Sequence, residues 1–159
     1  MITAGMITAG AVTAGVVTEA LRLVAALGCG LVAGLLLAFS AGVTTALGRL
    51  PGDAGADAMR AVNAAVLNPL FLGVFVGSAV GCAALAVAVA VTGGPLLAGV
   101  AAGLHLVGVI GVTAAVNVPM NDALAARTVD WVSYRRRWTG WNHVRTGVAV
   151  LAAVLLVLS

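Results

Sequence analysis

Long apolar runs separated by short polar segments make up most of this chain. Four of these runs, at about residues 21–46, 69–92, 96–116 and 141–158, carry almost no charge. An α-helix rises about 1.5 Å per residue, so each run is long enough, or nearly so, to cross the roughly 30 Å hydrocarbon core of a bilayer. The pattern predicts an all-α integral membrane protein built as a four-helix up-down bundle.

The connections between the runs carry recognisable helix boundaries. Asp53 is a good N-cap residue, and the polar positions after it recur three apart, which predicts a short interfacial helix over about 54–67. Asn68-Pro69 is typical of a helix start, because Asn caps well and Pro is tolerated at the first helical position. The uncharged T-G-G-P at residues 92–95 predicts a tight turn between spans two and three.

A low-complexity near-repeat, M-I-T-A-G-M-I-T-A-G, opens the chain. No basic residue precedes it, so it lacks the positively charged region of a signal peptide. It is either a frayed extension or additional helix. We treat residues 1–20 as an N-terminal extension without an assigned function, and residues 21–159 as the four-span membrane domain.

Composition and charge agree with a membrane protein. Apolar residues make up 62% of the chain and charged residues 8%, against about 25% charged in soluble proteins. The net charge of +3 comes from one stretch, residues 117–145, whose five arginines outnumber its two aspartates, and this clustering indicates a lipid bilayer rather than nucleic acid as the partner. The positive-inside rule places loops one and three in the cytoplasm and both termini outside the cell membrane.

Small residues recur every four positions in two of the spans. Gly73, Gly77 and Gly81 lie in the second span, and Gly99 and Gly103 in the third. Such faces let another helix approach closely, either within the protomer or across a homo-oligomer.

Chemistry concentrates in residues 117–145, which hold all three Trp, the only Tyr and one of two His. Trp138, Asn142 and Arg145 recur at i, i+4 and i+7 and therefore share one helix face, whereas His143 lies about 100° from Asn142. All five asparagines fall near the same membrane face: Asn63, Asn68, Asn117, Asn121 and Asn142. They indicate a shared pocket or, alternatively, a set of helix caps and loop ends.

Four motifs resemble the anthrone oxygenase-like family of small four-span membrane proteins. They are G-L-L-L-A-F-S (34–40), A-M-R-A-V-N-A-A-V-L-N-P-L-F (58–71), G-V-T-A-A-V-N-V-P-M-N-D-A-L (111–124) and W-T-G-W-N-H-V-R-T (138–146). The resemblance covers the chain from about Leu21 to its end. Arg60 stands where the family pattern leads us to expect Gln.

The resemblance implies oxidation of an anthrone or another phenolic aromatic substrate by dioxygen, without a metal, flavin or other cofactor. Such a pocket needs a base, donors for an oxyanion and an aromatic slot. By resemblance and chemistry, His143 is the expected base. The expected donors are Asn117, Asn121, Asn142 and Arg145, and the expected substrate contacts are Trp138, Trp141, Asn63 and Asn68.

Other interpretations stay open at this point. The same Asn, Trp, His and Arg residues could form an interfacial anchoring network in a non-catalytic binding or assembly protein. Haem between His105 and His143 is excluded by about 18 Å of helix rise, and copper on His143 with Met120 or Met59 lacks a ligand spacing. Cys29 and Cys82, each beside a Gly in an apolar run, indicate packing, and His105 is either functional or a satisfied core histidine.

Overall fold

The computed structural model describes residues 2–159, which form helices joined by short connections, with no strand in this range. Four helical rods are long and apolar enough to cross a membrane: Val12–Leu47, Pro69–Thr92, Leu96–Ala125 and Trp131–Leu158. The prediction of an all-α, multi-pass membrane protein with four spans is confirmed. The elements in chain order are α1 (Ile2–Ala38), η1 (Phe39–Val43), α2 (Thr44–Leu47), α3 (Ala54–Ala65), α4 (Pro69–Thr92), α5 (Leu96–Leu104), η2 (His105–Gly111), η3 (Thr113–Asn117), α6 (Val118–Ala125) and α7 (Trp131–Leu158).

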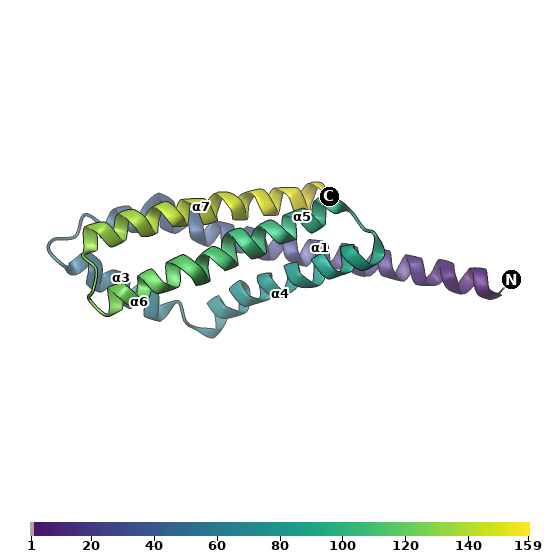
Figure 1. The fold of residues 1–159 in the computed structure, drawn as a ribbon, viewed down its shortest axis with the longest axis horizontal. Helices are drawn as coiled ribbons and strands as arrows, with labels where there is room; N and C mark the ends of the chain where they lie inside the picture. The colour runs from purple at the N-terminus through teal and green to yellow at the C-terminus, as the bar shows by residue number, and fades with distance from the viewer. Residues whose placement is uncertain (1) are drawn as a thin grey trace.

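The rods are longer than the apolar runs that predict them. Helix α1 is continuous from Ile2, so the low-complexity stretch from residue 2 is helical, and it projects beyond the rest of the bundle (Figure 1). The third rod continues to Ala125 instead of ending near residue 116, and α7 begins at Trp131 instead of near residue 141. Hydropathy misses the extensions of the third and fourth rods because they are polar turns at the membrane edge. The division of the chain at residue 20 stays a prediction.

Helix boundaries follow the local chemistry in most places. Asn68 caps α4, since its side chain accepts a hydrogen bond of 3.0 Å from the backbone N–H of Phe71. Gly93 closes the same helix in the left-handed conformation with φ of 68°, which the predicted tight turn requires. The predicted helix over about 54–67 is present as α3, but Asp53 makes no side-chain capping bond.

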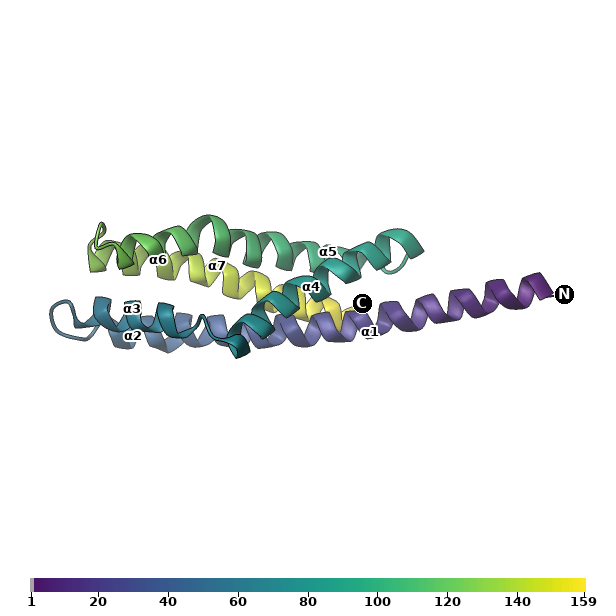
Figure 2. The same ribbon diagram turned by 90° about the horizontal axis from the view of Figure 1, so that it is seen from below.

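Helix α1 packs against both α4 and α7, and α5 packs against α4 and α7. Helix α4 crosses the bundle obliquely (Figure 2). Helices α1 and α4 approach closely at Gly28, where an added Cβ would lie 2.9 Å from Cβ of Ser78. Gly73 and Gly77 contact nothing within 4 Å of an added Cβ, so only Gly81 of the predicted groove meets α1. Packing of that groove against a second protomer stays a prediction.

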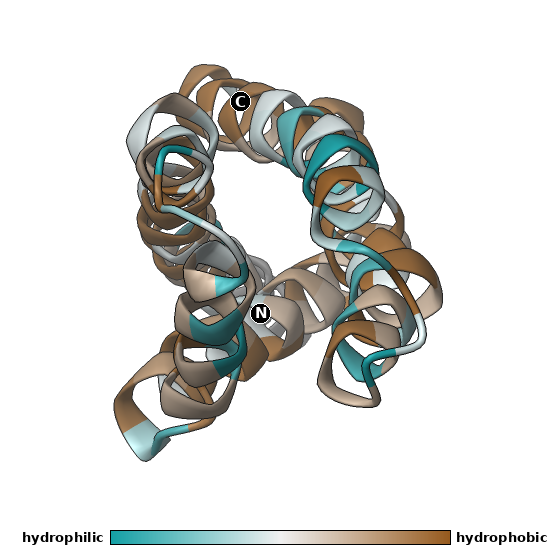
Figure 3. Ribbon diagram, turned by 90° about the vertical axis from the view of Figure 1, so that its left-hand side faces the viewer, coloured by the Kyte–Doolittle hydropathy of each residue, from teal (hydrophilic) through white to brown (hydrophobic). Residues whose placement is uncertain are grey.

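The core differs at the two ends of the bundle. At the end where α4 turns into α5, the buried residues are mostly small, and include Ala25, Cys29, Ala101 and Ala152. The opposite end carries α3, α6 and the start of α7, and Figure 3, which looks onto it, shows hydrophilic stretches among hydrophobic ones. We name them the small-residue end and the polar end.

Candidate functional site

The polar end encloses a cavity of about 450 Å³, within the range of about 300–1,000 Å³ usual for small-molecule sites. Its walls come from α1, η1, α3, α4, η3, α6 and α7. Most of the lining is apolar, including Leu36, Phe39, Phe71, Phe75 and Trp138. The polar groups in the lining are Arg60, Asn63, Thr113, Asn117, Asn121, Asp122 and Arg145.

Arg145 places a buried positive charge in this wall. The residue is 4% exposed; Nη1 donates to Thr113 Oγ1 at 2.9 Å and Nη2 to Asn142 Oδ1 at 2.7 Å. Its guanidinium carbon lies 5.4 Å from the centroid of the Trp138 ring, and its Nε is buried without a hydrogen-bond partner. No ion pair involves Arg145 in the part of the chain that the structure describes. A buried, uncompensated charge is costly and is characteristic of a functional site inside a membrane protein.

Asn142 fixes the position of Arg145. Its Nδ2 donates to the carbonyl oxygen of Leu36 and to Ser40 Oγ, both at 2.8 Å, while its Oδ1 accepts from Arg145. Ser40 belongs to the π-helical turn η1, a distortion that is frequent at functional sites. Asn142 is therefore a positioning residue that joins α7 to the first span.

Asn121 organises the aromatic wall. Its Oδ1 accepts from the Tyr134 hydroxyl at 2.8 Å and from Trp138 Nε1 at 2.9 Å. Tyr134 and Trp138 are both buried, and Trp138 also packs against Phe39 with ring centroids 5.7 Å apart. These bonds hold the Trp138 ring against the cavity instead of toward lipid.

Asn117 is the unusual amide of the cavity. It is 1% exposed, and neither its Nδ2 nor its Oδ1 has a hydrogen-bond partner. Burying an unpaired amide costs roughly 1–3 kcal/mol in proteins. Because Asn117 lines the cavity at the end of η3, a polar group of a bound molecule could satisfy it.

Three residues predicted for the site lie outside it. His143 is exposed on α7 and does not line the cavity, because it lies about 100° around the helix from Asn142. Trp141 is 41% exposed and also outside the lining, so the cation–π partner of Arg145 is Trp138 and not Trp141. The side chain of Asn68 caps α4 and lies outside the cavity lining. The geometry does not support His143 as the base or the other two as substrate contacts.

The cavity brings together Asn63, Asn117, Asn121, Trp138 and Arg145 from the predicted set, with Asn142 directly behind Arg145. Thr113 and Asp122 also line the cavity and were not among the predicted site residues. Thr113 had a signal, because residues 113, 117 and 121 recur every four positions and share one helix face. Asp122 supplies the one carboxylate among the lining residues.

Arg60, at the position where Gln was expected, belongs to the cavity rim. It forms an ion pair with Asp57 and donates to the Leu124 carbonyl oxygen at 3.4 Å. The exposed residues Leu67, Asp122 and Ala125 also line this side. The cavity is therefore exposed beside the loops of the polar end, and it is also exposed along the span faces that carry Leu72 and Val118.

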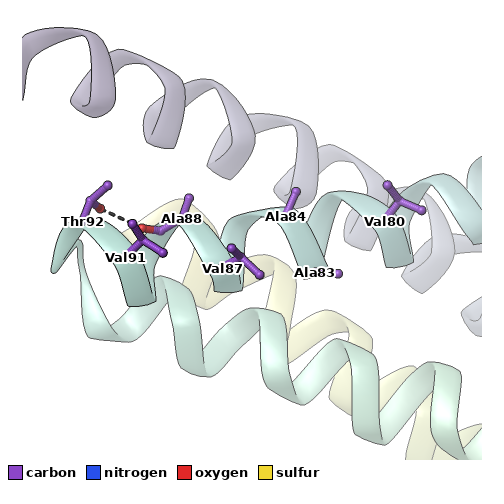
Figure 4. A pocket seen from close by; sticks show the side chains of 7 residues that line it. All are labelled: Val80, Ala83, Ala84, Val87, Ala88, Val91 and Thr92. Carbon is purple, nitrogen blue, oxygen red and sulfur yellow. Dashed lines mark hydrogen bonds between the residues drawn. The ribbon is translucent and has the colours of Figure 1, made fainter. Parts of the chain in front are cut away.

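A second hollow is a shallow groove along residues 80–92 of α4 (Figure 4). Its side chains are apolar except for Thr92, whose hydroxyl donates to the Ala88 carbonyl oxygen at 2.8 Å. No free polar group orients a ligand there, and lipid chains fit such a surface. The polar cavity is therefore the candidate site.

The cavity suits a flat aromatic molecule that carries or develops a negative charge. Aromatic and aliphatic walls would hold the rings, while the guanidinium of Arg145 and the amide of Asn117 would meet an oxygen. Fixed donors in a water-poor site stabilise an oxyanion strongly.

Comparison with known proteins adds one finding. The sequence model of a family described as anthrone oxygenase matches residues 70–155, more than half of the chain. The match contains Asn117, Asn121, Trp138, Asn142 and Arg145, but not α3. Neither the curated proteins nor the solved structures give a match.

Proposed function

Because the chain belongs to the anthrone oxygenase family, we propose that it is a membrane-embedded oxygenase that oxidises an anthrone-like or related phenolic aromatic substrate. The substrate would occupy the polar cavity with its oxygen toward Arg145. By the positive-inside rule, the polar end would face the cytoplasm, because it carries Arg49, Arg127 and Arg135. The cavity would then open on the cytoplasmic side, and both termini would lie outside.

The buried guanidinium of Arg145 is the observation that carries this proposal. Deprotonation of an anthrone-type C–H gives an enolate whose charge rests largely on the ring oxygen. Arg145, which has no carboxylate partner among the described residues, would stabilise that oxygen in the transition state. Asn117 would donate a second hydrogen bond from its unpaired amide.

The proposed reaction converts a ring CH₂ group and dioxygen into a carbonyl group and water. Loss of one C–H proton to a base gives the enolate, whose carbon passes electrons to dioxygen as a C–O bond forms. The resulting peroxide takes up a proton. Loss of the second C–H proton with cleavage of the O–O bond leaves one oxygen in the quinone and releases the other as water.

Asp122 is the base that we propose for the first proton, in place of the exposed His143. It is the one carboxylate among the lining residues and lies on the solvent-exposed rim, from which the proton can leave. A base must come within hydrogen-bond reach of the proton that it removes. The rim position meets this condition for a substrate whose acidic carbon points toward the loops.

A binding protein for the same class of molecule is the second candidate function. Trp141, which is 41% exposed, would act as an interfacial anchor in either case. Binding without turnover would distinguish this alternative, because the cavity would then take up the aromatic molecule and consume no dioxygen.

The test is dioxygen uptake by the purified protein in lipid nanodiscs, with anthrone and a hydroquinone offered as substrates. We expect quinone formation from anthrone and incorporation of one labelled oxygen from ¹⁸O₂. Arg145→Met should reduce turnover by about 10²–10³-fold, the effect of removing an oxyanion donor. Arg137→Met is the matched control, because Arg137 is exposed on the same helix. Equal rates for Arg145→Met and wild type would refute the role of the guanidinium, and absence of uptake on every substrate would refute the oxygenase.

A further inference from the structure

A cluster of three metal-ligating side chains lies in the membrane interior, apart from the cavity. Cys29 of α1, Cys82 of α4 and His105 at the start of η2 are each 0% exposed. The two sulfurs are 3.6 Å apart, and both sulfurs and a ring nitrogen of His105 lie within 4.8 Å of one another. The three residues come from three different membrane spans.

The hydrogen bonds around His105 determine its tautomer. Ser78 Oγ donates its one proton to the Phe75 carbonyl oxygen at 2.8 Å, so it can only accept at 3.0 Å from Nε2 of His105. Nε2 therefore carries the hydrogen, and Nδ1 has a free lone pair. Nδ1 is buried and has no hydrogen-bond partner. Metal-binding histidines are held in this way, with one ring N–H donating to a neighbouring acceptor and the other nitrogen left for the ion.

We propose that Cys29, Cys82 and His105 bind one thiophilic d¹⁰ metal ion, Zn²⁺ or Cu⁺. Two thiolates and an imidazole are the soft and borderline ligands that both ions prefer. Zn–S bonds of about 2.3 Å in a tetrahedral site imply sulfurs about 3.8 Å apart, close to the 3.6 Å found here. Binding would bring Nδ1 to about 2.0–2.1 Å from the ion through rotation of the three side chains.

The two ions differ in how they suit the site. Two thiolates cancel the charge of Zn²⁺ and give a neutral complex, which favours this ion in an apolar interior. Cu⁺ would leave one net negative charge but needs only these three ligands, whereas a structural Zn²⁺ site takes a fourth ligand beyond the three side chains. In both cases binding releases the two thiol protons, because the thiolate is the ligand.

The position of the cluster indicates a structural role for the ion. Cys29 lies three residues before Val32, and Ser78 three residues after Phe75, and both Val32 and Phe75 line the cavity. The ligand Cys82 lies seven residues after Phe75, and His105 eight residues before Thr113, which also lines the cavity. The ion would therefore sit roughly one to two helical turns beyond the inner end of the cavity. There it would clamp three of the spans that form the cavity walls.

The experiment measures bound metal in protein purified under reducing conditions without chelator. We expect one Zn²⁺ or Cu⁺ per chain by elemental analysis, and a copper-specific chromophore assay on the unfolded protein separates the two ions. Protein loaded with Co²⁺ should show thiolate-to-metal charge-transfer absorption. Cys29→Ala and Cys82→Ala should lose both signals, while Met59→Leu, a sulfur-removing variant at the polar end, should keep them.

Ser78→Ala keeps the test meaningful if the cysteine variants fail to fold. It leaves all three ligands in place but removes the acceptor of the His105 N–H, so metal affinity should fall by about 10–100-fold. Two findings would overturn the proposal: protein that takes up no metal and shows no Co²⁺ absorption, or an intact mass two hydrogens lower with no metal, which would identify a Cys29–Cys82 disulfide. These readouts are independent of oxygenase activity.

Discussion

The two ends of the bundle solve the problem of burying four helices in different ways. At the small-residue end, Ala, Gly and Cys residues let the helices approach closely, as at Gly28 and Ser78. At the polar end, aromatic rings, asparagines and an arginine hold the helices apart around a cavity of about 450 Å³. Close packing stabilises the bundle through van der Waals contacts, because the hydrophobic effect contributes little to helix association inside a membrane. The wider spacing at the polar end leaves room for a ligand.

Two asparagines show the same contrast within the polar end. Asn142 uses its side chain in three hydrogen bonds to Leu36, Ser40 and Arg145, whereas Asn117 uses neither of its side-chain polar atoms. The first amide is required by the fold, and the second is available to a ligand. The predictions below test this division, beginning with the largest expected effect.

Asn142→Leu should lower the free energy of unfolding by about 3 kcal/mol, because it removes three hydrogen bonds worth roughly 0.6–1.7 kcal/mol each in membrane proteins. It also leaves Arg145 with one fewer acceptor. Equilibrium unfolding in mixed micelles would measure the loss. The exposed neighbour His143→Ala is the control and should match wild type in stability. An unchanged midpoint for Asn142→Leu would mean that this network is not structural.

Asn117→Leu should have the opposite profile. The free energy of unfolding should stay equal to that of wild type or rise, since the variant removes an unpaired buried amide. Turnover on anthrone should fall by about 10²-fold, because an oxyanion donor is lost. Asn68→Ala is the converse control, because Asn68 caps α4 outside the cavity and should affect stability alone. A stability loss in Asn117→Leu without a change in turnover would contradict the division between the two amides.

The features that the sequence predicts correctly are those that depend on neighbouring residues along the chain. The apolar runs identify four spans because length and hydropathy are local properties, and Asn68 is recognisable as a cap from its neighbour Pro69. The face shared by Trp138, Asn142 and Arg145 follows from helical periodicity, and the structure brings all three to the cavity wall or directly behind it.

The remainder depends on how each helix is rotated toward its neighbours. His143 has the chemistry of a general base, but its angular separation of about 100° from Asn142 directs it away from the cavity. Cys29, Cys82 and His105 are separated by 53 and 23 residues along three spans, so their proximity depends on three rotational settings that no local pattern contains. The loop near residues 121–138 was expected to be partly helical, and it contributes the end of α6 and the start of α7. The spans themselves are longer than predicted, because hydropathy does not extend a span over polar turns.

At the small-residue end, Gly28→Ala should destabilise the protein by about 1–3 kcal/mol. The added Cβ would lie 2.9 Å from Cβ and 3.1 Å from Cα of Ser78, so α1 and α4 must move apart. Gly30→Ala is the matched control, because an added Cβ there meets nothing within 4 Å. Thermal unfolding of both variants in the same detergent checks the prediction, and equal midpoints would show that close approach at Gly28 is not required.

The smallest expected effect concerns the start of α7, which carries Arg145 into the membrane. Asp130 caps this helix by accepting from the backbone N–H of Ser133 at 2.9 Å, and that bond holds the pKa of the Asp130 carboxyl below its usual range. A lowered pKa means that the stabilisation is complete above the unfolded-state pKa of about 3.9 and is lost as the pH falls through the lower folded-state value.

Asp130→Ala should therefore lower the unfolding midpoint by a few degrees at pH 7, and its difference from wild type should shrink below about pH 4. Asp130→Ser should have an unfolding midpoint close to that of wild type at pH 7, because a hydroxyl also caps the helix. Its midpoint should not show that pH dependence, because the hydroxyl does not ionise. If Asp130→Ser were as unstable as Asp130→Ala at pH 7, the charge of the carboxylate near the helix terminus, and not the cap geometry, would stabilise the polar end of α7.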